Sequence, residues 1–218
     1  MWAFPGTAWR NSVGPSKGAP MYARIVQSTA ATDIDGGVAF VRDNVVPIAQ
    51  QQHGYRGLAV SADRSASVFG VVSLWTEKAA LDGSDSALAK TRDEGEEIIG
   101  GQLSVEAFEE VVFEVTQPPT VGTSLLIRRL TMDPAKVEDN IAFFRTTILP
   151  QIKATAGFRG VRQLINRETG SAIVSTLWDD PAAMDQAAVE AEARQAQAAG
   201  RVTFGAQSKR EILFVDQL

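Results

Sequence analysis

The sequence predicts an α+β protein made of two copies of one unit, each with the element order β-α-β-β-α-β. The first observation is an internal repeat, because a shift of 103 positions places residues 54–57 (Gly-Tyr-Arg-Gly) on residues 157–160 (Gly-Phe-Arg-Gly). Between residues 39 and 79, twelve of forty-one aligned positions are identical, where unrelated sequence would match at only a few. The second observation is the spacing of apolar residues, which switches between strand and helix patterns in the same order in both copies. With 218 residues, the chain is long enough for two domains of about 100 residues each.

The sequence divides into four segments. Residues 1–20 are predicted to be a flexible extension, since they carry three Gly, three Pro and no apolar periodicity. The first domain spans residues 21–116, the linker residues 117–123 and the second domain residues 124–218, because paired prolines and a glycine stop both neighbouring elements. Two alternatives for the extension stay open. One is that the natural protein starts at Met21. The other is that the extension is an arm that docks into an apolar groove through Trp2, Phe4 and Trp9.

The first domain opens with a strand at Met21–Val26, which is rich in β-branched and aromatic residues. A helix is predicted over residues 33–52 from apolar residues spaced by three or four, and Pro47 is expected to kink it. Gly54 suits the left-handed residue just past the helix end. The other predicted elements are hairpin strands 58–62 and 67–75, a helical region 76–99 broken near 82–85, and a strand 110–115.

The second domain repeats this order. Asp133 and Pro134 form a cap and first position for a helix that Gly157 ends. Asp180 and Pro181 do the same for an Ala- and Gln-rich helix that runs to about Ala199. The predicted strands are residues 125–130, 161–165, 171–178 and 211–215, and the buried stripe of the first helix is Val137, Ile141, Phe144 and Ile148.

Each unit would form a four-stranded antiparallel sheet with two helices on one face and no cover on the other. We expect the uncovered face to be apolar, with the residues Val71, Val111 or Val112, Phe113, Val174 and Phe214. An exposed apolar sheet of this size needs a partner, and the short linker keeps the other copy at high effective concentration. The sequence therefore predicts that the two copies pack sheet to sheet as one closed, pseudosymmetric unit.

Composition restricts the functional class. The net charge of −5 and the absence of a basic cluster argue against a nucleic-acid partner. No apolar run reaches the roughly 18 residues that span a bilayer, so no membrane partner is expected. The chain has no Cys, which excludes disulfides and thiolate chemistry. In the absence of a secretory signal, a cytoplasmic location is the default expectation.

These features resemble the dimeric α+β-barrel, or ferredoxin-like, superfamily. The layout of helix, Pro, Gly-aromatic-Arg-Gly, hairpin and Leu-Trp looks like its antibiotic biosynthesis monooxygenase branch, over about residues 21–116 and 124–216. Members of that branch are usually single domains that homodimerise, so this chain resembles a tandem fused pair. The resemblance implies two ferredoxin-like domains packed sheet to sheet as an intramolecular dimeric α+β barrel.

The resemblance implies a monooxygenase that needs no cofactor and acts on a small electron-rich aromatic, such as a quinol or an anthrone-like molecule. Fold alone constrains the chemistry loosely, because the superfamily also includes haem-degrading enzymes, small isomerases and members without demonstrated activity. Members that act on haem or anthrone-like substrates tend to offer Asn on the first strand and His or Tyr on the second helix. This chain offers Tyr22 and Arg24, or Arg128 and Arg129, on its first strands, and no His, Tyr or Asn on its second helices. Haem degradation is therefore not expected.

The candidate catalytic residues are His53, Tyr22 and Arg24. His53 is the only histidine and could act as a general base, although a solvated residue in the last helical turn is the interpretation we favour. Arg24, if it turns inward, would be a buried cation that needs partners, and Tyr22 could then donate a proton or hold a substrate oxygen.

The candidate substrate-binding residues are Trp75, Trp178, Arg56, Arg128 and Arg159. The two Trp residues could flank a flat aromatic substrate, but packing of the core is the commoner use of a Trp at a strand end. Arg56 and Arg159 occupy equivalent positions and could grip an anion, or more simply pair with carboxylates and carbonyls near helix ends. No metal site is predicted, because one His cannot form a two-His site and the carboxylates show no recognisable spacing.

Two hypotheses of function remain. The first is the monooxygenase, and the second is a non-catalytic, stress-associated or small-ligand-binding module. Both predict a small apolar or aromatic molecule as partner, and whether the fused pair forms a homodimer stays open. An enzyme predicts a cavity of about 300 Å³ or more with converging polar groups in at least one copy, whereas a structural module predicts clefts filled by the protein's own side chains.

Overall fold

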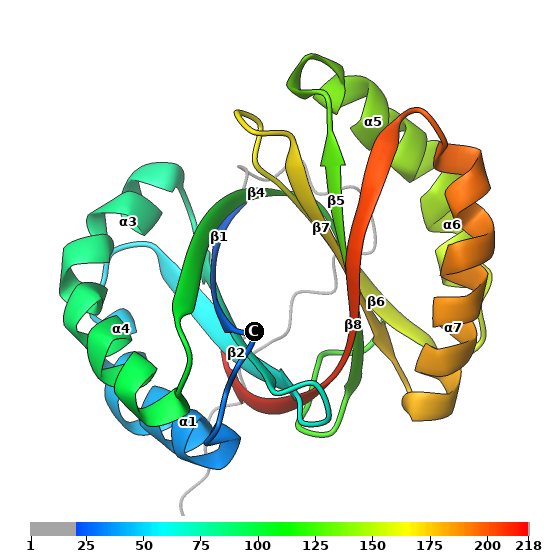
Figure 1. Ribbon diagram of the computed structural model, residues 1–218. Helices are drawn as coiled ribbons and strands as arrows, with labels where there is room; N and C mark the ends of the chain where they lie inside the picture. Colours follow the sequence, from blue (N-terminus) through cyan, green and yellow to red (C-terminus); the bar gives the residue numbers. More distant parts are fainter. Residues whose placement is uncertain (1–20, 218) are drawn as a thin grey trace, which may run out of the picture.

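The computed structural model describes residues 21–217, in which eight strands close into a barrel with helices on its outside (Figure 1). The strand order around the barrel is β1-β3-β2-β8-β5-β7-β6-β4. Each half of the chain supplies four consecutive strands of this order, so the barrel consists of two four-stranded antiparallel sheets joined at both edges. The predicted fold class is confirmed.

The first half has the predicted order of elements. Its strands are β1 (Met21–Ser28), β2 (Tyr55–Asp63), β3 (Val68–Trp75) and β4 (Leu103–Val115). Its helical segments are α1 (Ile34–Phe40), a π-helical turn (Val41–Val45), α2 (Val46–Ala49), α3 (Lys78–Gly83) and α4 (Asp85–Ile99).

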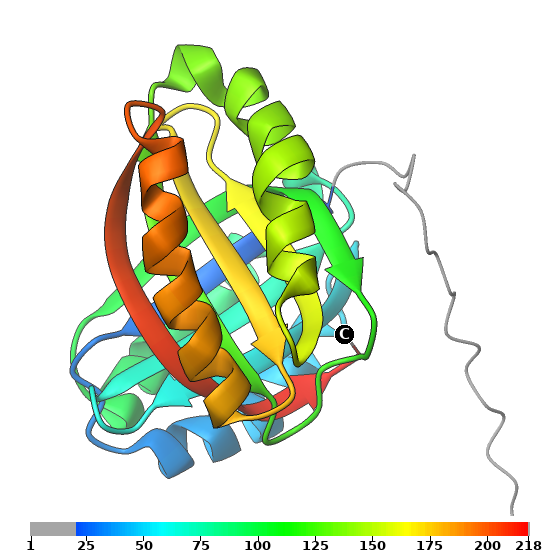
Figure 2. The ribbon, with the colours of Figure 1, turned by 90° about the vertical axis from the view of Figure 1, so that its right-hand side faces the viewer.

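The second half repeats this order, and its helices cover the outer face of its sheet (Figure 2). Its strands are β5 (Ser124–Met132), β6 (Phe158–Ile165), β7 (Ser171–Trp178) and β8 (Val202–Asp216). Its helical segments are a 3-10 turn (Pro134–Lys136), α5 (Val137–Phe143), a π-helical turn (Phe144–Ile148), α6 (Leu149–Ala154), α7 (Pro181–Arg194) and a final 3-10 turn (Gln195–Ala198).

The last strand of each half is much longer than the sequence predicts, because it belongs to both sheets. The first part of β4 pairs with β1 of its own half, and its last part, from Glu109 to Val115, pairs with β6 of the other half, with a bulge between Glu110 and Val112. The strand β8 does the same, pairing first with β5 and then with β2. A bulge lets a strand turn from one sheet into the next, so these two strands close the barrel.

The two prolines inside the first helices produce a wider turn. A π-helical turn precedes Pro47, and another precedes Pro150 at the equivalent place of the second half. Proline lacks a backbone N–H and crowds the preceding turn, and a π turn relieves both problems without ending the helix. The expected kink is therefore accommodated inside a helix that continues to Ala49.

The prediction of which residues form the uncovered sheet face is mostly wrong, because it selects the neighbours of the inward-facing residues along each strand. Val71, Val112, Val174 and Phe214 pack in the clusters beneath the helices, although Val71 also borders the barrel cavity. Phe113 lines the barrel interior as predicted. The reason is that both faces of β3 and β7 are apolar, so alternation alone does not say which face meets the helices. The inward residues include Ile25, Val72, Ile127, Leu164, Ile173 and Leu177.

The helices of residues 21–217 include none that combines the length and the apolar character needed to cross a membrane. The residues of the predicted N-terminal extension, with Trp2, Phe4 and Trp9, lie outside the described residues.

Candidate functional site

Three cavities concern function. The first cleft and the second cleft lie between sheet and helices in the first and second half, and the barrel cavity lies inside the barrel. The two clefts are equivalent, because most of their lining positions differ by the repeat shift of 103. The matching pairs include Phe40 and Phe143, Val41 and Phe144, Val45 and Ile148, Ala49 and Ile152, Leu88 and Ala191, Thr91 and Arg194, and Ile99 and Val202.

The first cleft is small, with a volume of about 60 Å³, and its main charged group is already fully engaged. Arg24 is buried and donates hydrogen bonds to Ser84 Oγ at 2.9 Å and to the carbonyl oxygen of Leu81 at 2.7 Å. Its guanidinium also lies 3.3 Å from a carboxylate oxygen of Asp85 and 5.9 Å from the ring centroid of Trp75. Burial lowers the pKa of Arg24, and Asp85 partly offsets that effect. Arg24 therefore fastens β1 to the junction of α3 and α4.

A second arginine of the first cleft, Arg92, forms an ion pair of 3.0 Å with Asp85. Its Nη1 is buried without a hydrogen-bond partner in the protein. The cleft thus offers one spare donor and, among the described residues, no unpaired buried acceptor.

The second cleft has a volume of about 110 Å³ and a different set of polar residues, which are Arg128, Asn140, Gln163 and Arg194. Asn140 lies on α5 and is 5% exposed, and its amide nitrogen donates to the carbonyl oxygen of Lys136 at 3.0 Å. Gln163 lies in the middle of β6 and is 2% exposed. The amide oxygens of Asn140 and Gln163 are both buried without a hydrogen-bond partner in the protein.

Leaving a buried acceptor unpaired costs about 1–3 kcal/mol, so two of them in one cleft need an explanation. The first half offers none, because the positions equivalent to Asn140 and Gln163 are Gly37 and Val60. The fold therefore does not require these amides. They give the second cleft two acceptors that a donor on a bound molecule would satisfy.

Arg128 supplies the cationic group of the second cleft. It donates a hydrogen bond to Gln207 Oε1, and its guanidinium lies 5.8 Å from the ring centroid of Phe204. Burial lowers the pKa of Arg128, and the more distant Glu192 partly offsets this. No carboxylate of residues 21–217 forms a salt bridge with Arg128, so its charge is available to an anionic group.

Arg194 closes one side of the second cleft through a hydrogen-bonded network. It donates to Glu190 Oε2 at 2.5 Å and to Thr155 Oγ1 at 3.0 Å, and Thr155 donates to Glu190 at 2.6 Å. These bonds, with that to Thr155 foremost, lower the pKa of Glu190. Because Glu190 is held as a carboxylate, it neutralises the charge of Arg194. Arg194 therefore lines the second cleft without offering a free charge to a ligand.

Neither cleft reaches the cavity volume of about 300 Å³ that the enzyme hypothesis predicts, although the second cleft does have the converging polar groups. The available space fits a single aromatic ring better than a three-ring system. Three aromatic side chains line the second cleft, which are Phe143, Phe144 and Phe204.

The two Trp residues proposed for substrate binding are completely buried beneath the helices. Trp75 Nε1 donates to Ser73 Oγ at 3.1 Å, and Trp178 Nε1 donates to Thr176 Oγ1 at 2.9 Å. Tyr55 packs edge-on against Trp75, and Phe158 packs in the same way against Trp178. Neither Trp lines any of the three cavities.

The other candidates are dispersed. The side chain of His53 is 86% exposed and lies 3.5 Å from Glu77, and Arg56 is exposed. Tyr22 is half-buried beside the Trp75 cluster. Arg159 donates to Thr123 Oγ1 at 3.4 Å and to the carbonyl oxygen of Pro118 at 3.3 Å, so it holds the segment between β4 and β5. Of the eight residues named from the sequence, Arg24 and Arg128 line a cleft, and they belong to different clefts.

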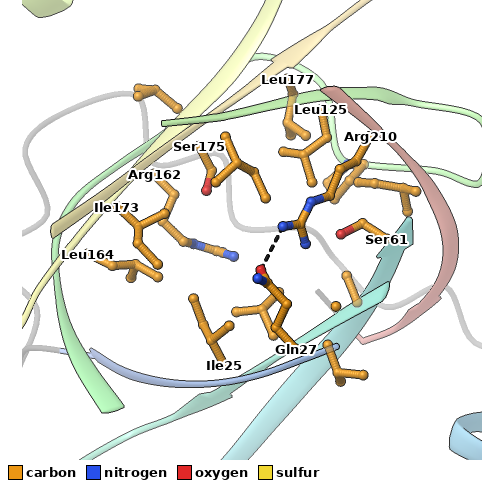
Figure 3. Close-up of a pocket in the computed structure, with 18 of the residues that line it drawn as sticks. Ile25, Gln27, Ser61, Leu125, Arg162, Leu164, Ile173, Ser175, Leu177 and Arg210 are labelled. Atoms are coloured by element: carbon orange, nitrogen blue, oxygen red, sulfur yellow. Dashed lines mark hydrogen bonds between the residues drawn. The ribbon is translucent and has the colours of Figure 1, made fainter. Parts of the chain in front are cut away.

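The barrel cavity has a volume of about 100 Å³ and mostly apolar walls, and Figure 3 shows Arg162 and Arg210 pointing into it. Sequence reasoning missed this cavity and the amides Asn140 and Gln163. A signal was present, since comparing the copies position by position shows a polar residue where the other copy has an apolar one. Among residues 21–217, no group of three His, Asp or Glu side chains is arranged to hold a metal ion.

Comparisons with known proteins agree with the fold. No family model matches the chain. The uncharacterized protein Rv2557 of Mycobacterium tuberculosis is 28% identical over 167 residues, which is 76% of this chain and 75% of that protein. The uncharacterized protein Rv2558 of the same organism is also 28% identical over 167 residues, or 71% of each chain.

Two solved structures are similar over nearly their whole length. A Fusobacterium nucleatum protein that carries the provisional name of a monooxygenase has a TM-score of 0.68 and 12% identity, covering 91% of this chain and 94% of its own. An anthrone oxidase-like protein has a TM-score of 0.67 and 11% identity, covering 93% of this chain and 96% of its own. At such identities the likeness concerns the fold. The chain has the dimeric α+β-barrel fold of these two proteins, built as a tandem fused pair within one chain, as the sequence resemblance predicts.

Proposed function

We propose that the protein is a cofactor-independent monooxygenase that oxidises a small, single-ring quinol in its second cleft. The observation that carries the proposal is the pair of unpaired buried amide oxygens, Asn140 Oδ1 and Gln163 Oε1, in the same cleft as the unneutralised Arg128. A quinol has hydroxyl donors for the amide oxygens and becomes an anion that the guanidinium stabilises. The monooxygenase-like names of proteins with this fold support the reaction class.

In this reaction the electron-rich substrate itself reduces dioxygen. The deprotonated quinol transfers electrons from its ring to O₂, and a carbon–oxygen bond forms. The oxygen–oxygen bond then breaks, one oxygen atom stays on the ring and the other leaves as water with two hydrogens from the substrate. A quinol and O₂ thus give a hydroxyquinone and water. The protein is required to orient and desolvate the anion and to exclude bulk water.

The roles of the cleft residues follow from their chemistry. Asn140 and Gln163 accept hydrogen bonds from the substrate hydroxyls and fix the ring, and Arg128 favours the ionised form. Phe143, Phe144 and Phe204 supply apolar contacts for the faces of the ring. Among the residues that line the cleft there is no His, Asp or Glu to take the proton, so the protein acts on the pKa of the substrate through Arg128.

The test is oxygen consumption by the purified chain with methyl-substituted hydroquinones, combined with mass spectrometry of the product. The proposal expects one O₂ consumed per product formed, and a product that has gained one oxygen atom and lost two hydrogen atoms. Simple oxidation to the parent quinone, with hydrogen peroxide as the second product, would contradict it. Tight binding of the quinol without turnover would favour the non-catalytic module instead.

A further inference from the structure

The pseudosymmetry of the barrel is broken at one place in its interior. Ala23 of β1 and Leu125 of β5 occupy equivalent places in the two halves. Phe108 of β4 pairs with Ala23, and Arg210 of β8 pairs with Leu125. Arg210 is therefore the equivalent of Phe108. Around Phe108 the interior is plugged by apolar side chains that touch one another, which are Ala23, Leu74, Leu164 and Ile173.

The equivalent place around Arg210 is built differently. The position of Ile173 is taken by Gly70, and that of Leu164 by Ser61. A Cβ atom on Gly70 would lie 2.4 Å from Arg210 Nη1, so the glycine makes room for the guanidinium. Two large apolar residues of one half are thus replaced by small residues in the other, beside a buried cation.

Among the described residues Arg210 has no carboxylate at ion-pair distance, and the more distant Asp63 offsets its charge only in part. Arg210 is 6% exposed, and its Nε donates to Ser208 Oγ at 2.9 Å and its Nη2 to Gln27 Oε1 at 2.6 Å. These bonds use two of the five N–H groups of a guanidinium. A buried arginine is normally paired, because an isolated charge in an apolar interior is costly.

The other two arginines of the barrel cavity are neutralised. Arg129 forms an ion pair of 2.7 Å with Glu106, and Arg162 lies 2.6 Å from Glu110 and over the ring of Phe113. The Arg162 pair is a charge contact without hydrogen-bond geometry, since both facing atoms lack a hydrogen-bond partner. Among the lining residues that the structure describes, Arg210 is therefore the cation without an ion-pair partner, which suits a monoanion.

We propose that the barrel cavity is a binding site for a small carboxylate with an apolar body, whose carboxylate pairs with Arg210. Figure 3 shows the guanidinium of Arg210 held by Gln27 beside apolar side chains, among which Ile25, Leu125 and Leu177 would contact the body of the ligand. The half-exposed Phe113 and Pro119 of the segment between β4 and β5 also line the cavity and mark the side on which it meets solvent. A cavity of about 100 Å³ fits a single ring or a short chain. This site is separate from the second cleft and does not depend on the reaction proposed there.

The test is calorimetric titration of the full chain at pH 7 with benzoate, phenylacetate and hexanoate. Benzyl alcohol, which has the same ring without the charge, and inorganic phosphate, which has charge without the apolar body, serve as matched probes. We expect at least one carboxylate to bind at least about tenfold more tightly than benzyl alcohol, since a charge-assisted pair in a buried site has that effect, and phosphate not to compete.

Three variants place the binding in the barrel cavity. The double variant Arg210→Met, Gln27→Leu removes the charge and its partner together, and Ser61→Leu fills the cavity as Leu164 does at the opposite end. Each should weaken carboxylate binding at least about tenfold, whereas Gln163→Val, in the second cleft, should not. Because the two changes act by different means, failure of one variant to fold leaves the other as the test.

The outcomes separate this proposal from the proposed function. Loss of carboxylate binding in the barrel variants, with quinol oxidation unchanged, supports the site. The proposal is overturned if none of the three carboxylates binds, if benzyl alcohol binds as tightly as benzoate, or if the barrel variants bind carboxylate like the unmodified chain. Each of these results is independent of whether the second cleft turns over a quinol.

Discussion

The guanidinium of Arg210 occupies the space that a side chain at Gly70 would need, since Nη1 lies 2.4 Å from the position of a Cβ atom there. The backbone of Gly70 does not have the positive φ that requires glycine, so the residue is small for reasons of space. The repeat shows the alternative, because Ile173 fills the same position of the other half. At this level one duplicated interior is therefore apolar, and the other is built around a cation.

This contact gives a first prediction. Gly70→Ala should destabilise the chain by about 0.5–1.5 kcal/mol, because the new methyl group forces the end of the Arg210 side chain to move away from its hydrogen-bond partners. In an Arg210→Met background the same change should cost much less, so the two substitutions should not be additive. Urea unfolding of the unmodified chain, the two single variants and the double variant measures the coupling between the two substitutions. Additive effects would show that the two residues do not share the space.

A second prediction concerns stability. Replacing Arg210 by Met together with Gln27 by Leu should raise the free energy of unfolding at pH 7 by about 1–3 kcal/mol, since a buried cation without a described carboxylate at ion-pair distance is exchanged for apolar packing. This gain would be measured as a higher denaturant concentration at the unfolding midpoint, with the same dependence of the free energy of unfolding on denaturant concentration in both proteins. A clear loss of stability would mean that the guanidinium holds the barrel together and is not kept for a ligand.

The same arginine predicts a dependence on pH. Burial, and secondarily Arg129, lowers the pKa of Arg210 to about 10 from an ordinary value of 12.5, while Asp63 partly offsets this. Below pH 10 the residue is charged in both the folded and the unfolded chain, and the full cost of burial is present. As the pH rises above 10, the folded state loses the proton before the unfolded state does, so the unfolded state binds more protons and stability rises.

The stability difference between the unmodified chain and the Arg210→Met, Gln27→Leu variant should therefore be constant between about pH 6 and 9 and should narrow above pH 10. Unfolding curves of both proteins are measured in parallel. The effect of the other groups that titrate at alkaline pH is then the same in both proteins and cancels in the stability difference. A difference that widens above pH 10 would contradict the assignment.

More of the fold than of the candidate site could be predicted from the sequence. The repeat and the strand order, carried by pairs such as Trp75 and Trp178, were sufficient for the barrel, because equivalent residues make equivalent contacts in both halves. Which apolar residues face inward was not predictable from β3, whose two faces are both apolar. The extra length of β4 and β8 depends on pairing with the other half, which local patterns do not contain.

The candidate sites were harder to predict because their residues are ordinary types in ordinary positions. Gln163 reads as one polar residue in a strand, and only the structure shows that it is 2% exposed with an unpaired oxygen. Residues with conspicuous chemistry were less informative. His53 is on the surface, and Arg159 fastens the segment between β4 and β5.

A further prediction separates structural aromatics from functional ones. Trp178→Ala should cost about 3–5 kcal/mol, because the ring is fully buried, hydrogen-bonded to Thr176 and packed on Phe158. Val189→Ala, on the exposed side of the same half, is the control and should change stability by less than about 0.5 kcal/mol. Trp178→Phe should keep most of the quinol oxidation rate, and its complete loss in a folded protein would assign the indole to the substrate.

The central claim is that the two duplicated clefts have diverged and that the second cleft carries the reaction. The most direct measurement is the steady-state rate of quinol-dependent oxygen consumption in two variants with one change each. Gln163→Val gives the second cleft the residue that Val60 provides in the first half, and Thr91→Val removes a hydroxyl from the first cleft. We predict that Gln163→Val lowers kcat/KM at least about tenfold and that Thr91→Val leaves it unchanged. Equal rates for Gln163→Val and the unmodified chain, or a loss confined to Thr91→Val, would contradict the account.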